Sequence, residues 1–110
     1  MQISVTESGE IRIVSFDGDL DGQTSPMAQN ALQELLGQGA RFILIDCRKL
    51  SFISSVGLRV LLVAAKQAQH AQGGVRICAA NESVMEVFNM TGFDTIIPVH
   101  ASLDEAIEQF

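Results

Sequence analysis

Two adjacent serines, Ser54 and Ser55, stand where an apolar run ends and a helical pattern begins. The first N–H groups of a helix lack partners within it, so a hydroxyl at this point can accept a hydrogen bond from them. The same groups, with the positive end of the helix dipole, also stabilise a phosphate. Because one serine is enough for a cap, Ser55 is a candidate phosphorylation switch, with simple capping as the alternative for either serine.

The residues that follow the serines have types found on docking surfaces. Gly57 lowers helix stability by roughly 0.5 to 1 kcal/mol relative to alanine. Without a side chain, it would let a foreign backbone approach the first turn of the helix, with a purely local role at the junction of strand and helix as the alternative. Val56, Val60 and Val63 form a stripe beside Ser55, which we expect to be buried, with an exposed contact strip as the alternative.

An acidic segment earlier in the chain copies the first half of a calcium loop. It places carboxylates at Asp17, Asp19 and Asp21 and a glycine at Gly22. The twelfth position, which should supply a bidentate glutamate, is Ala28. We therefore expect a turn of solvated carboxylates and no bound metal.

No catalytic set accompanies the serines. A nucleophilic serine needs a base beside it, and the two histidines, His70 and His100, lie far from Ser54 and Ser55 in the sequence. The chain also lacks the glycine-rich loops that hold phosphates or dinucleotides. We therefore expect no catalysis and no cofactor, with both histidines at the surface or at helix caps.

Composition indicates one ordinary folded domain over residues 1–110, with 47% hydrophobic and 18% charged residues. The net charge is −6 and the seven Lys and Arg are scattered, so we expect no nucleic-acid partner. No apolar run approaches the roughly 20 residues of a membrane span, and no leader opens the chain, so we expect a cytoplasmic location without membrane insertion.

Cys47 and Cys78 lie in apolar strand patterns, where we expect buried thiols, with a disulfide as the alternative.

Alternating strands and helices must position these features. The apolar spacing predicts strands at residues 3–5, 11–16, 42–45, 75–79 and 95–99, and helices that open at Ser25, at the two serines, at Asn81 and at Ser102. The predicted class is α/β, in the order ββαβαβαβα. Parallel pairing is expected wherever a helix joins two strands.

The chain resembles the STAS domain family over nearly its full length. Four motifs in order carry the resemblance: Gly18-Asp19-Leu20-Asp21 and residues 42–46, 50–58 and 84–92. They are most similar to the free-standing bacterial anti-sigma factor antagonists. The resemblance implies a single STAS-type domain, with a mixed, mostly parallel sheet and helices packed mainly on one face, that acts as a protein-binding regulator.

The resemblance also implies a switch. Family members bind an anti-sigma factor that is itself a serine kinase, which frees a sigma factor, and the kinase releases itself by phosphorylating the serine at the start of the helix. A phosphatase restores the binding form. By position, the acceptor corresponds to Ser55 and the family's loop aspartate to Asp21. The residues expected to contact the partner are Asp21, Ser54, Ser55, Val56, Gly57 and Arg59.

This chain departs from the family pattern on both sides of the acceptor. The best-known antagonists have an aspartate before the acceptor and a serine or threonine after it, whereas this chain has Ser54 and Val56. Ser54 is therefore the alternative acceptor. Two other functions stay open: an adaptor subunit of a lipid or solute transporter, and a sensor that holds a nucleotide or an anion at the helix N-terminus.

Overall fold

The first two strands form an antiparallel hairpin. In the computed structural model, which describes residues 1–110, β1 (Gln2–Ser8) pairs with β2 (Ile11–Leu20) in one unbroken register. Gly9 makes the turn at φ 60°, a conformation that glycine adopts without strain. The predicted hairpin is confirmed, and β2 extends beyond its predicted end.

Helices and short strands alternate along the rest of the chain. They are α1 (Ser25–Gly37), β3 (Phe42–Asp46), β4 (Leu50–Ile53), α2 (Ser55–His70), β5 (Gly74–Cys78), α3 (Glu82–Thr91), a 3₁₀ helix (Phe93–Thr95), β6 (Val99–His100) and α4 (Leu103–Gln109). The predicted order is confirmed, with β4 added between the strand predicted at residues 42–45 and the helix that follows the serines. None of the helices is both long and apolar enough to span a membrane.

The main sheet has the order β1-β2-β3-β5-β6, and every pair after the hairpin is parallel. The helices α1, α2 and α3 provide the crossovers that parallel strands need. β2 is long enough to pair twice, with β3 along its first half and with β4 at its end. This second pairing positions the segment that leads into α2.

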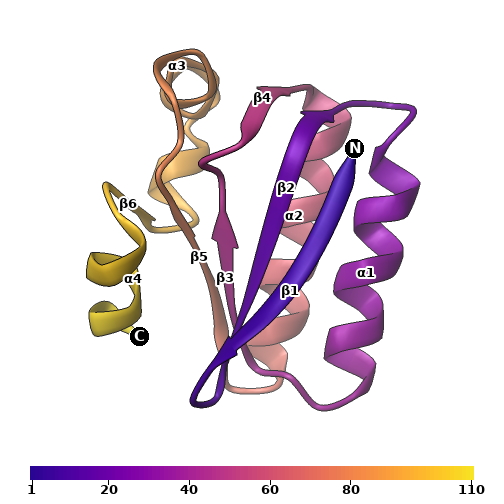
Figure 1. Cartoon of the computed structure of the whole chain (residues 1–110), viewed down its shortest axis with the longest axis vertical. Helices are drawn as coiled ribbons and strands as arrows, with labels where there is room; N and C mark the ends of the chain where they lie inside the picture. Colours follow the sequence, from indigo (N-terminus) through magenta and orange to yellow (C-terminus); the bar gives the residue numbers. More distant parts are fainter.

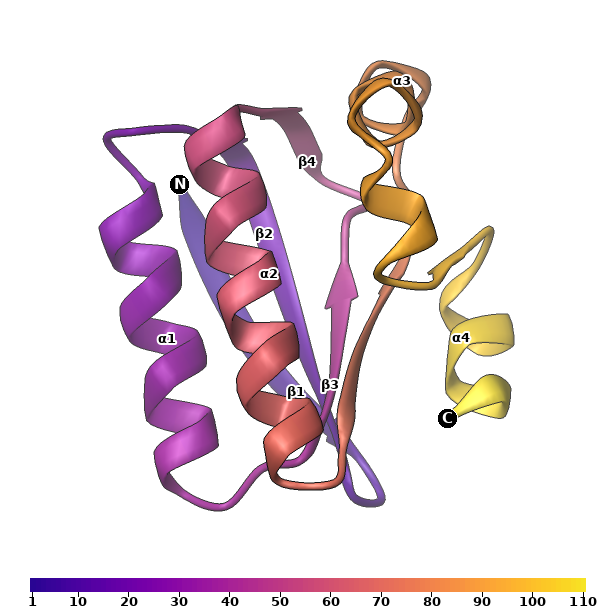
Figure 2. The same ribbon diagram turned by 180° about the vertical axis from the view of Figure 1, so that it is seen from behind.

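More helices pack on one face of the sheet than on the other. α1 and α2 lie side by side on one face (Figure 2), and the main core between them and the sheet includes the buried side chains of Phe16, Leu32 and Leu61. α4 packs on the other face (Figure 1), where Leu44 and Ala106 are buried in a smaller cluster. The helices therefore lie mainly on one face, as predicted.

The C-terminal segment differs from the strand predicted at residues 95–99. Phe93–Thr95 form a 3₁₀ helix, and only Val99–His100 form a strand. Phe93 is buried and stacks on Phe88, with the ring centroids 4.7 Å apart, which turns the chain inward before it reaches the sheet. Pro98 also lacks an N–H group to donate to a strand ladder. The prediction of a five-residue strand was wrong.

Two of the three helix caps predicted outside the serine pair are confirmed. The side chains of Asn81 and Ser102 each accept a hydrogen bond from the N–H group three residues further on. α1 instead begins one residue earlier than predicted, with Thr24 as the cap residue and Ser25 as the first helical residue. The Ser25 hydroxyl donates to the backbone carbonyl of Asp21 at 2.5 Å, which ties the helix to the preceding loop.

Both cysteines are free and buried, in clusters on opposite faces of the sheet. Cys47 lies in the main core and Cys78 in the cluster beneath α4. Burial raises the pKa of the Cys78 thiol to about 11 and raises the pKa of Cys47 still further. The prediction of buried thiols is confirmed.

Candidate functional site

β2 and β4 end side by side and bring two loops together. Leu20, the last residue of β2, pairs with Ile53, the last residue of β4. The N–H of Ser54 then donates to the carbonyl oxygen of Leu20 at 2.9 Å. The loop that contains Asp21 therefore lies beside the start of α2, at the end of the molecule where α1 and α2 both begin (Figure 1).

Ser54 is the cap residue of α2. Its backbone is extended, with φ −97° and ψ 174°, and its hydroxyl accepts a hydrogen bond from the N–H of Gly57 at 3.3 Å. Its carbonyl oxygen accepts the N–H of Leu58 at 2.9 Å. The side chain is half-buried. Ser54 is therefore committed to the local structure of the helix start.

Ser55 is the first helical residue and is exposed. Its side chain has no hydrogen-bond partner in the protein, in contrast with that of Ser54. Its own N–H group is among the first four of the helix, which have no partner within the helix. Of the two serines, Ser55 thus has the hydroxyl that a second protein can reach.

Gly57 is buried against the chain's own strands. A Cβ at this position would lie 2.8 Å from the Leu20 carbonyl oxygen and 3.0 Å from Cγ1 of Ile53. Of the two alternatives for Gly57, the local role fits and room for a foreign backbone does not, because β2 already occupies that space. The glycine instead allows α2 to begin tightly against the ends of β2 and β4.

The valine stripe on α2 is mostly exposed. Val60 is buried, but the side chains of Val56 and Val63 are 48% and 40% exposed. The prediction that the whole stripe is buried was wrong, and the alternative of a contact strip fits two of its three members. Phe52 on β4 is also 51% exposed, and nothing in its apolar run distinguished it from a buried residue.

Arg59 lies one turn below Ser55 on α2 and is exposed. It forms no hydrogen bond or ion pair; the ion pairs of the protein involve Arg12, Arg48 and His100 instead. Residues four apart on a helix are neighbours on its surface. The structure therefore brings a free hydroxyl and a free guanidinium onto the same patch.

Asp21 shapes the loop beside the serines. Its Oδ1 accepts N–H groups from Gln23 at 2.9 Å and from Thr24 at 3.1 Å. These bonds, that from Thr24 foremost, lower the pKa of the Asp21 carboxyl below its usual value. The hydroxyl of Thr24 in turn donates to the carbonyl of Asp19 at 2.7 Å. Asp21 thus holds the loop in one conformation against the start of α2.

The other candidate residues do not converge on this patch. Asp17 and Asp19 lie within strand β2, so the acidic segment is extended rather than wrapped as a calcium loop. His70 lies at the far end of α2, about 22 Å from Ser55 at 1.5 Å per residue. It is exposed, as predicted, whereas His100 lies half-buried in β6, 3.1 Å from Arg76.

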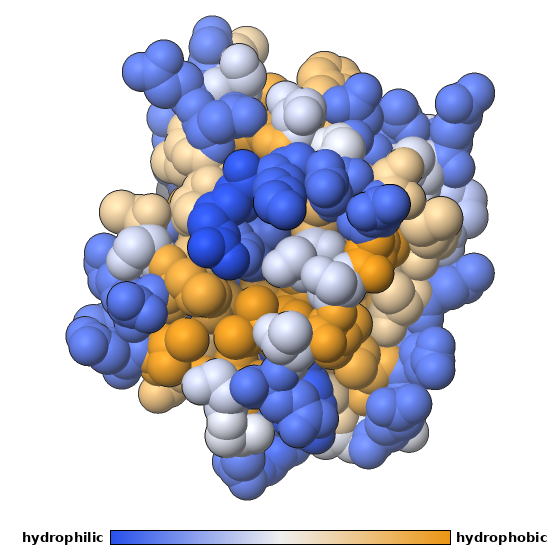
Figure 3. All heavy atoms as spheres, viewed as in Figure 1, coloured by the Kyte–Doolittle hydropathy of each residue, from blue (hydrophilic) through white to orange (hydrophobic).

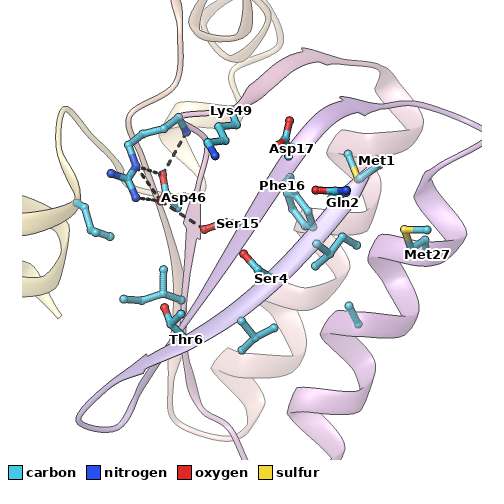
Figure 4. Close-up of a pocket in the computed structure, with 16 residues that line it drawn as sticks. Met1, Gln2, Ser4, Thr6, Ser15, Phe16, Asp17, Met27, Asp46 and Lys49 are labelled. Carbon is cyan, nitrogen blue, oxygen red and sulfur yellow. Dashed lines mark hydrogen bonds and ion pairs between the residues drawn. The ribbon is translucent and has the colours of Figure 1, made fainter.

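A groove in the molecule lies away from the serine patch. The groove has a volume of about 880 Å³ and runs along β1 (Figure 4). On the sheet face seen in Figure 3, apolar side chains gather in a band with hydrophilic side chains on either side. The buried carboxylate of the groove, Asp46, is bound by the Arg48 guanidinium at 2.9 and 2.7 Å and by the Ser15 hydroxyl at 3.4 Å. Neither Ser55 nor Arg59 lines this groove. The serine patch is an exposed surface, which suits a protein partner better than an enclosed small ligand.

The fold and sequence match known proteins closely. The STAS domain profile matches residues 2–106. BtrV of Bordetella bronchiseptica, a candidate anti-sigma factor antagonist, is 31% identical over 110 residues, which cover 100% of this chain and 95% of BtrV.

Solved structures agree on the fold. A candidate anti-sigma factor antagonist from Thermotoga maritima has a TM-score of 0.92 at 20% identity, covering 97% of this chain and 92% of its own. SpoIIAA of Bacillus in its phosphorylated form has a TM-score of 0.75 at 20% identity, with 98% of each chain covered. This chain therefore belongs to the STAS domain family and, within it, to the anti-sigma factor antagonists.

Proposed function

We propose that this protein binds a kinase-type anti-sigma factor through the surface around Ser55, in the cytoplasm, and is released when that kinase phosphorylates Ser55. One observation carries the proposal: the Ser55 hydroxyl is exposed and unpaired at the start of α2, whereas the Ser54 hydroxyl caps the helix. A kinase can reach Ser55 without opening the fold. The protein acts by binding and not by catalysis.

The docking surface consists of the exposed residues around Ser55, namely Phe52, Val56, Arg59 and Val63. Its apolar members supply area that a partner can remove from water, worth roughly 25 cal/mol per Å². Arg59 supplies a charge that an acidic group of the partner can pair with. This composition, apolar side chains with one arginine, is typical of the centre of a protein interface.

The modification is a phosphoryl transfer. The terminal phosphoryl group of ATP passes to Oγ of Ser55, the hydroxyl proton passes to a base of the kinase, and ADP leaves. A phosphatase adds water to the phosphate ester, which restores the hydroxyl and releases inorganic phosphate. Each modification adds a charge of about −1.5 to −2 at neutral pH.

This added charge explains release without a change of fold. A phosphate on Ser55 would stand among Val56 and the other apolar side chains of the docking surface, where a close-packed partner would have to strip its water. The N–H groups at the start of α2 tolerate the same phosphate in the free protein. The modified protein therefore stays folded while its complex is destabilised.

Mapping of the phosphate tests the proposal. The protein is incubated with ATP and the kinase-type anti-sigma factors of its own genome, and phosphopeptides are identified by mass spectrometry. We expect modification of the wild type at Ser55, none in Ser55→Ala, and modification retained in Ser54→Ala and in the control Ser83→Ala, which removes an exposed hydroxyl from the first turn of α3. Phosphate on Ser54, or none with any of these kinases, would contradict the proposal.

A further inference from the structure

Helix α2 begins without the charges that usually stabilise a helix start. Acidic side chains are favoured in the first turn because of the helix dipole, yet none of the 16 residues of α2 is acidic. Arg59 therefore has no acidic neighbour three or four residues away on its own helix. No residue of another element pairs with it either.

Ser55 and Arg59 are spaced for an ion pair once Ser55 carries a phosphate. They are four residues apart, both are exposed, and the acid would precede the base, the more favourable order along a helix. Guanidinium and phosphate form paired, charge-assisted hydrogen bonds. The next cation of α2, Lys66, lies about 16 Å from Ser55 along the helix axis and is out of reach.

We propose that Arg59 is the internal partner of phosphorylated Ser55: it holds the phosphate on the surface of α2 and is thereby withdrawn from the docking surface. This inference rests on the proposed function and adds a second cause of release. Phosphorylation removes the arginine that the unmodified protein offers to its partner, in addition to placing a hydrated charge in the interface. The same ion pair stabilises the modified helix start.

Acidic groups near the patch oppose a phosphate on Ser55. Asp21 lies in the loop beside the start of α2, and Asp19 is exposed on β2 opposite Phe52. Both carboxylates repel a phosphate, and the hydrogen bonds that Asp21 accepts keep it ionised. Arg59, one turn further along α2, offsets part of this repulsion.

Titration of the phosphate tests this role directly. Phosphoserine is installed at position 55 by genetic code expansion in the wild type and in Arg59→Gln, Arg59→Lys and the charge-matched control Lys66→Gln. The second pKa of the phosphate is measured by ³¹P NMR at low salt. We expect Arg59→Gln to raise this pKa by about 0.2 to 0.4, as for an ion pair on a helix surface, and Lys66→Gln to leave it unchanged. Arg59→Lys restores part of the shift, and high salt removes it.

An equal phosphate pKa in the wild type and in Arg59→Gln would overturn the inference. So would a rise of this pKa in Lys66→Gln as large as the rise in Arg59→Gln. The titration uses no partner protein. An unshifted pKa would therefore remove the role of Arg59 and leave the binding switch standing. Failure of kinase mapping would instead remove the switch, and the titration would be unaffected.

Discussion

Gly57 of α2 lies against the carbonyl group of Leu20 in β2, so closely that a Cβ would come within 2.8 Å of the oxygen. The same strand end accepts the N–H of Ser54. The start of α2 is thus fixed to the sheet by one hydrogen bond and one close packing contact. This attachment lets Ser55 project from the surface at a defined position.

Gly57→Ala should lower stability despite its better helix propensity. Overpacking against backbone costs about 1 to 3 kcal/mol, which exceeds the roughly 0.5 to 1 kcal/mol that alanine gains in a helix. The matched control is Gly37→Ala at the end of α1, where a Cβ meets no atom within 4 Å. Urea unfolding should show a loss for the first variant and none for the second. Equal stability of the two would contradict the packing assignment.

Substitution of Ser54 and of Ser55 should lower the free energy of unfolding by different amounts. Ser54→Ala removes the cap of α2 and should cost about 1 kcal/mol, whereas Ser55→Ala removes no intramolecular hydrogen bond and should change stability by less than about 0.5 kcal/mol. Thermal unfolding measures both. A larger loss from Ser55→Ala than from Ser54→Ala would show that their roles are exchanged.

Asp21 should make stability depend on pH. Its pKa is lower in the folded protein, so its contribution is present above the unfolded value near 3.8 and is lost as pH falls through the lower folded value. Asp21→Asn should therefore be less stable than the wild type at pH 6, and the gap should narrow below about pH 4. Denaturant unfolding at a series of pH values measures this gap. A gap that stays constant with pH would assign the effect to shape rather than charge.

Local signals in the sequence predicted most of the fold. The alternating hairpin, the unbroken apolar strand at residues 42–45 and the caps at Asn81 and Ser102 each have a short-range cause, and the structure confirms them. The strand predicted at 95–99 failed because the burial of Phe93 against Phe88 is a tertiary contact. The spacing of apolar residues along the sequence carries no information about such a contact.

The site was predicted less completely than the fold. Helical spacing showed that Val56, Val60 and Val63 share a face, but not how much of that face its neighbours cover, so the burial of the stripe was misjudged. Gly57 was singled out for the right reason, a close approach of backbone, but with the wrong partner. Which serine caps the helix depended on where the pairing of β4 with β2 ends, and that pairing joins residues far apart in the sequence.

Binding of the unmodified and the phosphorylated protein to the cognate anti-sigma factor tests the central claim most directly. Isothermal calorimetry compares the wild type, the protein with phosphoserine at position 55, Ser55→Asp and the charge-matched control Ser102→Asp, in which the aspartate can keep the cap of α4. We expect the phosphorylated protein to bind at least about thirtyfold more weakly than the unmodified protein, and Ser55→Asp also to bind more weakly. Ser102→Asp should bind as the wild type does. Thermal unfolding should be nearly unchanged in all of these proteins. Equal affinity of the phosphorylated and unmodified proteins would contradict the account.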